Sequence, residues 1–124
     1  MPSIVDIFSI SRRKKYDYES DKVKTEILKI LTEAKKELHE FKGNEPVLVI
    51  DFEDCKKLAV AARIDIDSWK DFEKDYGKKA IEHTLGTAKE CLVRYFKSKG
   101  LDKRDIRINN KARMILIFNP QKYL

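Results

Sequence analysis

The chain has 124 residues, of which 42% are hydrophobic and 39% charged, and its formal net charge is +6. This length fits one domain with a single core, and the charged share exceeds the roughly 25% of an average globular domain. No apolar run of about 18 residues is present and the N-terminus lacks the pattern of a secretion signal, so we expect a cytoplasmic protein without a membrane span. The abundance of Lys and Glu is typical of thermophile proteins, which use many ion pairs.

The first 18 residues differ from the rest and predict an N-terminal apolar segment followed by a basic arm. Residues 4–10 are mainly apolar, which suits an edge strand or a segment that docks on the sheet edge of a partner. The arm then carries four consecutive cations and two tyrosines: Arg12, Arg13, Lys14, Lys15, Tyr16 and Tyr18. Cations neutralise phosphates and tyrosine rings stack on bases, although a solvated tail is the alternative interpretation. Residues 19–124 are expected to form a single α+β domain.

The spacing of apolar residues predicts a helix that follows the arm. Ser20 is a candidate N-cap and Gly43 suits the position after the last turn. Between them, apolar side chains recur every three or four residues, at Val23, Ile27, Ile30, Leu31, Ala34, Leu38 and Phe41. The β-branched run from Pro46 to Phe52 then predicts a strand.

Residues 58–66 alternate between apolar and other side chains, which predicts a half-buried strand. Residues 53–57 would then be the loop of a hairpin. The alternative is a helix that begins at Asp54, because Ala59, Ala61 and Ala62 favour helix. We prefer the strand, since the apolar residues scatter on a helical plot.

A second helical region is predicted from Ser68 to Phe96, with a break near Gly77 and an end at Gly100. A C-terminal hairpin follows, with strands at 106–109 and 114–118 and a turn at 109–111, where asparagine tolerates positive φ. The order is α-β-β-α-β-β, and we expect a four-stranded, mainly antiparallel sheet with two helical regions packed on one face. The predicted core includes Leu31, Leu38, Ile50, Val60, Ile64, Leu92 and Leu116.

The C-terminal hairpin is the second basic candidate site. Residues 97–124 hold eight Lys or Arg against two Asp. We expect this stretch to form a basic two-stranded ribbon that can contact nucleic acid, with the cations Lys103, Arg104, Arg107, Lys111 and Arg113. The alternative is an edge strand that uses positive charge against aggregation.

Other chemistry-bearing residues give weaker patterns. The aromatic series Trp69, Phe72 and Tyr76 has the spacing of a helix core rather than of a stacking platform. The carboxylates of residues 51–54, with Asp65 and Asp67, could hold Mg²⁺ for phosphodiester cleavage, but charge runs are usually solvated. His39 and His83 lack metal-ligand spacing, and Cys55 and Cys91 are expected to be buried free thiols.

These patterns favour a nucleic-acid-binding protein, for DNA or RNA, that acts electrostatically and with low sequence specificity. We expect no catalytic residue, no metal and no cofactor. A protein–protein adaptor or oligomeric structural protein is the first alternative, and a divalent-metal-dependent nuclease is the second. We also expect a homodimer, because two hairpins leave open sheet edges.

Overall fold

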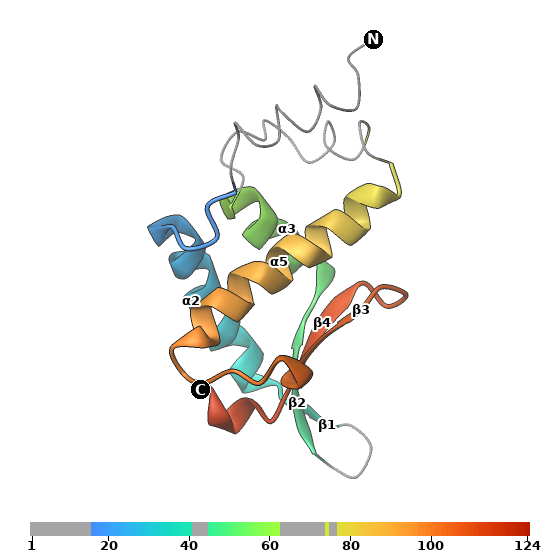
Figure 1. The fold of residues 1–124 in the computed structure, drawn as a ribbon. Helices are drawn as coiled ribbons and strands as arrows, with labels where there is room; N and C mark the ends of the chain where they lie inside the picture. Colours follow the sequence, from blue (N-terminus) through green and yellow to red (C-terminus); the bar gives the residue numbers. More distant parts are fainter. Residues whose placement is uncertain (1–15, 41–44, 63–73, 75–76) are drawn as a thin grey trace.

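The computed structural model describes residues 16–40, 45–62, 74 and 77–124. Within these ranges the chain is an α+β protein whose main elements follow in the order α-β-α-α-β-β, with one further two-residue strand after the first helix. Figure 1 shows how the helices and strands are arranged. The helices are α2 (Asp21–Lys36), α3 (Phe52–Ala62) and α5 (Lys79–Lys97), and they pack together against an antiparallel sheet. The predicted α+β class is therefore confirmed, but the predicted order of its elements is wrong.

Three strands of four or five residues form the body of the sheet: β2 (Pro46–Ile50), β3 (Ile106–Asn109) and β4 (Met114–Phe118). The two-residue strand β1 (His39–Glu40) is added at one edge, which gives the order β1-β2-β4-β3 with every pair antiparallel. Two short 3₁₀ turns, η1 (Lys103–Asp105) and η2 (Pro120–Lys122), flank the C-terminal hairpin. That hairpin, β3–β4, is confirmed as predicted.

The main correction concerns residues 53–62, which are helical and not a hairpin loop followed by a strand. Asp51 begins the helix, since its Oδ1 accepts a hydrogen bond from Asp54 N at 2.9 Å. Four buried side chains then recur at helical spacing, namely Cys55, Leu58, Ala59 and Ala62. Because residues 53–62 are helical, β2 pairs with β1 and β4 and not with a strand from this segment. Residues 63–66, including Ile64, lie outside the described residues.

The first predicted helix is confirmed at its start and is shorter than predicted at its end. Ser20 caps α2 by accepting a hydrogen bond from Val23 N at 3.2 Å. The helix stops at Lys36, and the chain then pairs as β1 with β2. Leu38 is therefore 39% exposed rather than part of the core.

Apart from Lys74, the second helical region is described from Gly77 onward. Gly77 has φ +59°, which is the left-handed conformation that glycine adopts without strain, and α5 begins two residues later. The predicted break at this glycine is confirmed, whereas Trp69, Phe72 and Tyr76 lie outside the described residues. None of the helices that the structure describes has both the length and the apolar character needed to span a membrane.

The core lies between the three helices and one face of the sheet. Leu31, Ile50 and Leu92 are buried as predicted. Leu116 is only half-buried, because the buried residues of β4 are Ile115 and Ile117, and Val60 on α3 is half-buried as well. The even-numbered residues of β4 consequently lie on the sheet face opposite the helices, where Arg107 pairs with Leu116 across the hairpin.

Candidate nucleic-acid interface

The end of the basic arm lies against the helices in the described part of the chain. Tyr16 is half-buried and shares a hydrogen bond with Nε2 of His83 on α5. Its ring lies 5.8 Å from that of Tyr18, and Asp17 N donates to Ala62 O at 2.8 Å. Tyr16 is thus used in packing, and Arg12, Arg13, Lys14 and Lys15 lie outside the described residues.

The cations predicted in the C-terminal hairpin are all exposed, but they occupy different environments. Lys103 and Arg104 belong to η1, Arg107 to β3, and Lys111 and Arg113 to the turn between β3 and β4. Their electrostatic partners therefore decide which of them can contact a phosphate.

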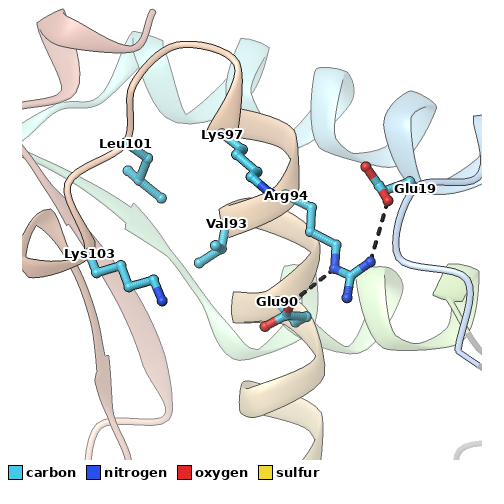
Figure 2. Close-up of a pocket in the computed structure, with 7 residues that line it drawn as sticks. All are labelled: Glu19, Glu90, Val93, Arg94, Lys97, Leu101 and Lys103. Carbon is cyan, nitrogen blue, oxygen red and sulfur yellow. Dashed lines mark hydrogen bonds and ion pairs between the residues drawn. The ribbon is translucent and has the colours of Figure 1, made fainter.

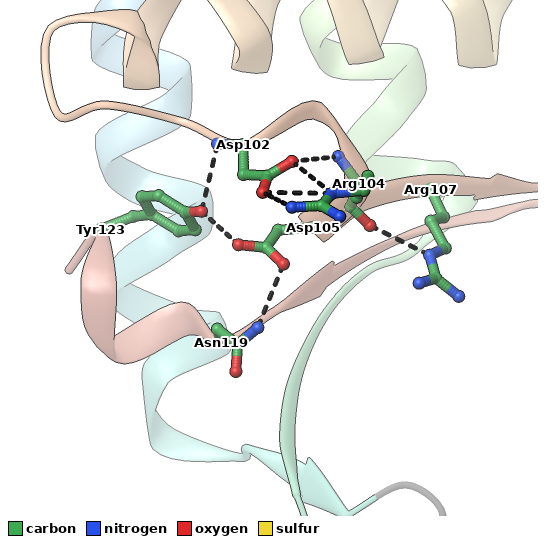
Figure 3. Close-up of polar contacts among 6 residues, drawn as sticks. All are labelled: Asp102, Arg104, Asp105, Arg107, Asn119 and Tyr123. Carbon is green, nitrogen blue, oxygen red and sulfur yellow. Dashed lines mark hydrogen bonds and ion pairs between the residues drawn. The ribbon is translucent and has the colours of Figure 1, made fainter.

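Arg104 forms an ion pair with Asp102. Its Nη2 lies 2.9 Å from Oδ2 and its Nε 3.2 Å from Oδ1 of that carboxylate, which also accepts from Arg104 N at 2.9 Å (Figure 3). These hydrogen bonds lower the pKa of Asp102 to about 2. The carboxylate stays ionised at neutral pH, and the positive charge of Arg104 is largely compensated.

Arg107 is fixed in its orientation, and no described carboxylate compensates its charge. Its Nε donates to the backbone oxygen of Arg104 at 3.0 Å, and its guanidinium carbon lies 4.6 Å from the centre of the Phe118 ring. Within the described residues no carboxylate pairs with it and its two Nη groups make no hydrogen bond. A guanidinium fixed through Nε presents both Nη groups as a fork, which matches two phosphate oxygens.

The hairpin turn adds two further cations. Asn109 Oδ1 accepts a hydrogen bond from Ala112 N at 2.9 Å and closes the turn. Within this turn the left-handed residue is Arg113, with φ +56°, and not Asn109 or Asn110. Neither Lys111 nor Arg113 has an ion-pair partner among the described residues, so the turn adds two uncompensated charges to the hairpin that carries Arg107.

A buried polar network fixes the segment that carries Arg104 and Arg107. Asp105 is only 8% exposed, and its carboxylate accepts hydrogen bonds from Asn119 Nδ2 at 3.0 Å and from the Tyr123 hydroxyl (Figure 3). The Tyr123 oxygen also accepts from Asp102 N at 3.3 Å. Burial and the hydrogen bond to Asp105 raise the pKa of Tyr123. The network ties the C-terminus to η1 and so positions the start of β3.

The described residues of the predicted acidic site, Asp51, Glu53 and Asp54, belong to the start of helix α3 and do not form a metal site. Asp51 caps α3, and Glu53 pairs with Lys56 at 2.6 Å. Burial and the neighbouring Asp51 raise the pKa of Asp54. Asp65 and Asp67 lie outside the described residues, and among the residues that are described no three His, Cys, Asp or Glu side chains are placed to hold a metal ion.

The two cysteines are buried and unpaired, as predicted. Burial, with smaller contributions from neighbouring carboxylates, raises the pKa of both Cys55 and Cys91 to about 12. Both thiols therefore stay protonated at neutral pH, and neither has the low pKa of a reactive nucleophile.

The structure thus separates the predicted hairpin site into two parts. Arg107, Lys111 and Arg113 belong to the β3–β4 hairpin, whereas Lys103 lines a pocket beside α5 (Figure 2). The sequence showed the five cations but not that Asp102 compensates one of them. Comparison with models of protein families, with curated proteins and with solved structures finds no match for this chain.

Proposed function

We propose that this protein binds nucleic acid electrostatically and with low sequence specificity, through the cations of the β3–β4 hairpin. The observation that supports the proposal best is the position of Arg107, whose guanidinium is oriented by Arg104 O and Phe118 while both Nη groups stay available. Arginine forks of this kind bind phosphate oxygens in pairs. Such contacts bind the backbone and carry no sequence information, which accounts for the low specificity.

The surroundings of Arg107 agree with this proposal. Lys111 and Arg113 extend the positive charge to the end of the hairpin, and no described carboxylate compensates it. If the charges only protected an edge strand from aggregation, a fixed orientation of one guanidinium would not be needed. Phosphate contacts, in contrast, gain from an oriented side chain because less conformational entropy is lost on binding.

The proposal is tested by fluorescence anisotropy with single- and double-stranded DNA and RNA, between about 50 and 200 mM salt. Each phosphate contact contributes about 0.7 to 0.9 to the slope of log affinity against log salt. Arg107→Ala should therefore weaken binding to every sequence and flatten the slope by about 0.7 to 0.9. Arg107→Ala combined with Arg113→Ala should flatten it by about 1 to 2.

Arg104→Ala is the matched control, because it removes the same type of side chain and the same charge from a position three residues away. Asp102 already occupies Arg104, so this variant should leave the slope unchanged. Equal effects of the Arg104 and Arg107 substitutions would show that net charge alone matters and would remove the role assigned to Arg107. Absence of affinity of the unmodified protein for all four nucleic acids at low salt would refute the proposed function.

A further inference from the structure

A pocket of about 470 Å³ lies between the last turns of α5 and the segment that connects α5 to β3 (Figure 2). This volume is within the range of about 300–1,000 Å³ that is usual for small-molecule sites. Its described lining residues are Glu19, Glu90, Val93, Arg94, Lys97, Leu101 and Lys103. The pocket is separate from the hairpin turn and from Arg107.

Arg94 compensates both acidic residues of the pocket. Its Nε lies 2.9 Å from Glu90 Oε1 and its Nη1 3.3 Å from Glu19 Oε2. The guanidinium carbon also lies 4.8 Å from the centre of the Tyr18 ring. The hydrogen bond to Glu90, with further contributions from Glu19, raises the pKa of Arg94. The two carboxylates are thus engaged on one side of the pocket, as Figure 2 shows.

Two lysines of the pocket have no such partner. Lys97 comes from α5 and Lys103 from η1, and neither forms an ion pair or a side-chain hydrogen bond with any described residue. Val93 and Leu101 are half-buried and provide apolar wall between them (Figure 2). The pocket therefore combines two uncompensated ammonium groups with an apolar surface.

We propose that this pocket binds a phosphate monoester carried by a nucleotide-sized organic group. Two ammonium groups match the two negative charges of a monoester, and lysine binds phosphate as a point charge. The apolar wall suits the less polar body of such a ligand. The same chemistry is offered by a free mononucleotide and by the phosphorylated end of a nucleic-acid strand. The proposal concerns binding without a chemical reaction, and it does not depend on the function proposed for the hairpin.

The first test uses adenosine 5′-monophosphate as the probe, followed by NMR of the methyl groups of Val93 and Leu101. The methyl resonances should shift and saturate with this probe, and adenosine should need at least about tenfold higher concentration, because it lacks the charge that the lysines bind. Lys97→Gln combined with Lys103→Gln should weaken binding of the monophosphate by about tenfold or more. Both lysines are exposed, so the fold should tolerate the change, and the dispersion of the methyl spectrum verifies that it does.

Lys78→Gln combined with Lys79→Gln is the matched control at the other end of α5. It removes the same charge about 27 Å away along the helix axis, by the rise of about 1.5 Å per residue. This control should leave the affinity for the monophosphate unchanged. A loss as large as that of the pocket variant would overturn the proposal, because it would show a response to net charge.

The second arm separates the two sources of the ligand. In the Arg107→Ala background, an oligonucleotide with a 5′ phosphate is compared with the same strand ending in a 5′ hydroxyl. Methyl shifts with the phosphorylated strand but not the hydroxyl strand identify a strand end as a ligand, and shifts with the mononucleotide alone identify a free nucleotide. No methyl shift with any phosphorylated probe, or an equal response to adenosine, would overturn the proposal while leaving the hairpin function untouched.

Discussion

Removing the hydroxyl of Tyr123 should destabilise the protein strongly, although it deletes a single atom. In Tyr123→Phe, the carboxylate of Asp105 loses one of its two described donors, and Asp102 N loses its acceptor. Asp105 is 8% and Tyr123 2% exposed, so water cannot readily replace the lost partner. A hydrogen bond to a buried charged group contributes about 1.5–3 kcal/mol, and we therefore expect a loss of about 2–3 kcal/mol.

Urea denaturation followed by circular dichroism measures this loss, and thermal unfolding should show a decrease of about 8–12 °C in Tm. Tyr95→Phe is the matched control, because Tyr95 is half-buried and its hydroxyl makes no hydrogen bond within the described residues. Its effect should stay below about 0.5 kcal/mol. If the two substitutions cost the same, the network around Asp105 does not hold the C-terminus to η1 as argued.

Three further predictions follow from the fold. Ala61→Leu should destabilise the protein by about 1–3 kcal/mol through overpacking, since Ala61 is 2% exposed in α3. Val60→Ala should destabilise it less. A larger loss of stability for Val60→Ala than for Ala61→Leu in urea denaturation would favour a strand. Cys55 and Cys91 should resist thiol reagents at pH 8, because their pKa is raised from 9.0 to about 12. The stability that the two buried thiols contribute is therefore present below pH 9 and is lost as the pH rises towards 12. Fast labelling of the native protein at pH 8 would contradict this. The dimer expected from open sheet edges remains a prediction, and light scattering at micromolar concentration that gives a monomer mass would refute it.

The α+β class, the start of α2 and the C-terminal hairpin could be read from the sequence because each depends on local signals. Ser20 caps α2 through its own side chain, and the apolar residues that follow have a helical period. The hairpin joins two short strands that are close in the chain, so its pairing needs little information from elsewhere. The buried free cysteines were also predicted, because the two lie far apart in the sequence and away from other metal-ligand residues.

The error at residues 58–62 shows where local pattern was ambiguous. This short stretch fits a helix as well as an alternating strand, since Cys55, Leu58, Ala59 and Ala62 are spaced as residues on one face of a helix. Asp51 as an N-cap, followed by Glu53 and Asp54 in the first turn, was the signal that favoured the helix. The predicted helix alternative rested on Ala59, Ala61 and Ala62 and did not include the Asp51 cap, and the β2–β4 pairing was missed together with the helix.

The sequence by itself determined the high charge, the α+β class and the basic C-terminal hairpin, because composition, caps and periodicity are properties of neighbouring residues. Only the tertiary structure decided which cations remain uncompensated. Arg107 is oriented by Phe118 of the neighbouring strand, and Arg94 joins Glu90 of its own helix to Glu19, which lies 75 residues away in the chain. Charge pairing across long sequence separations depends on packing, and packing is set by the whole fold.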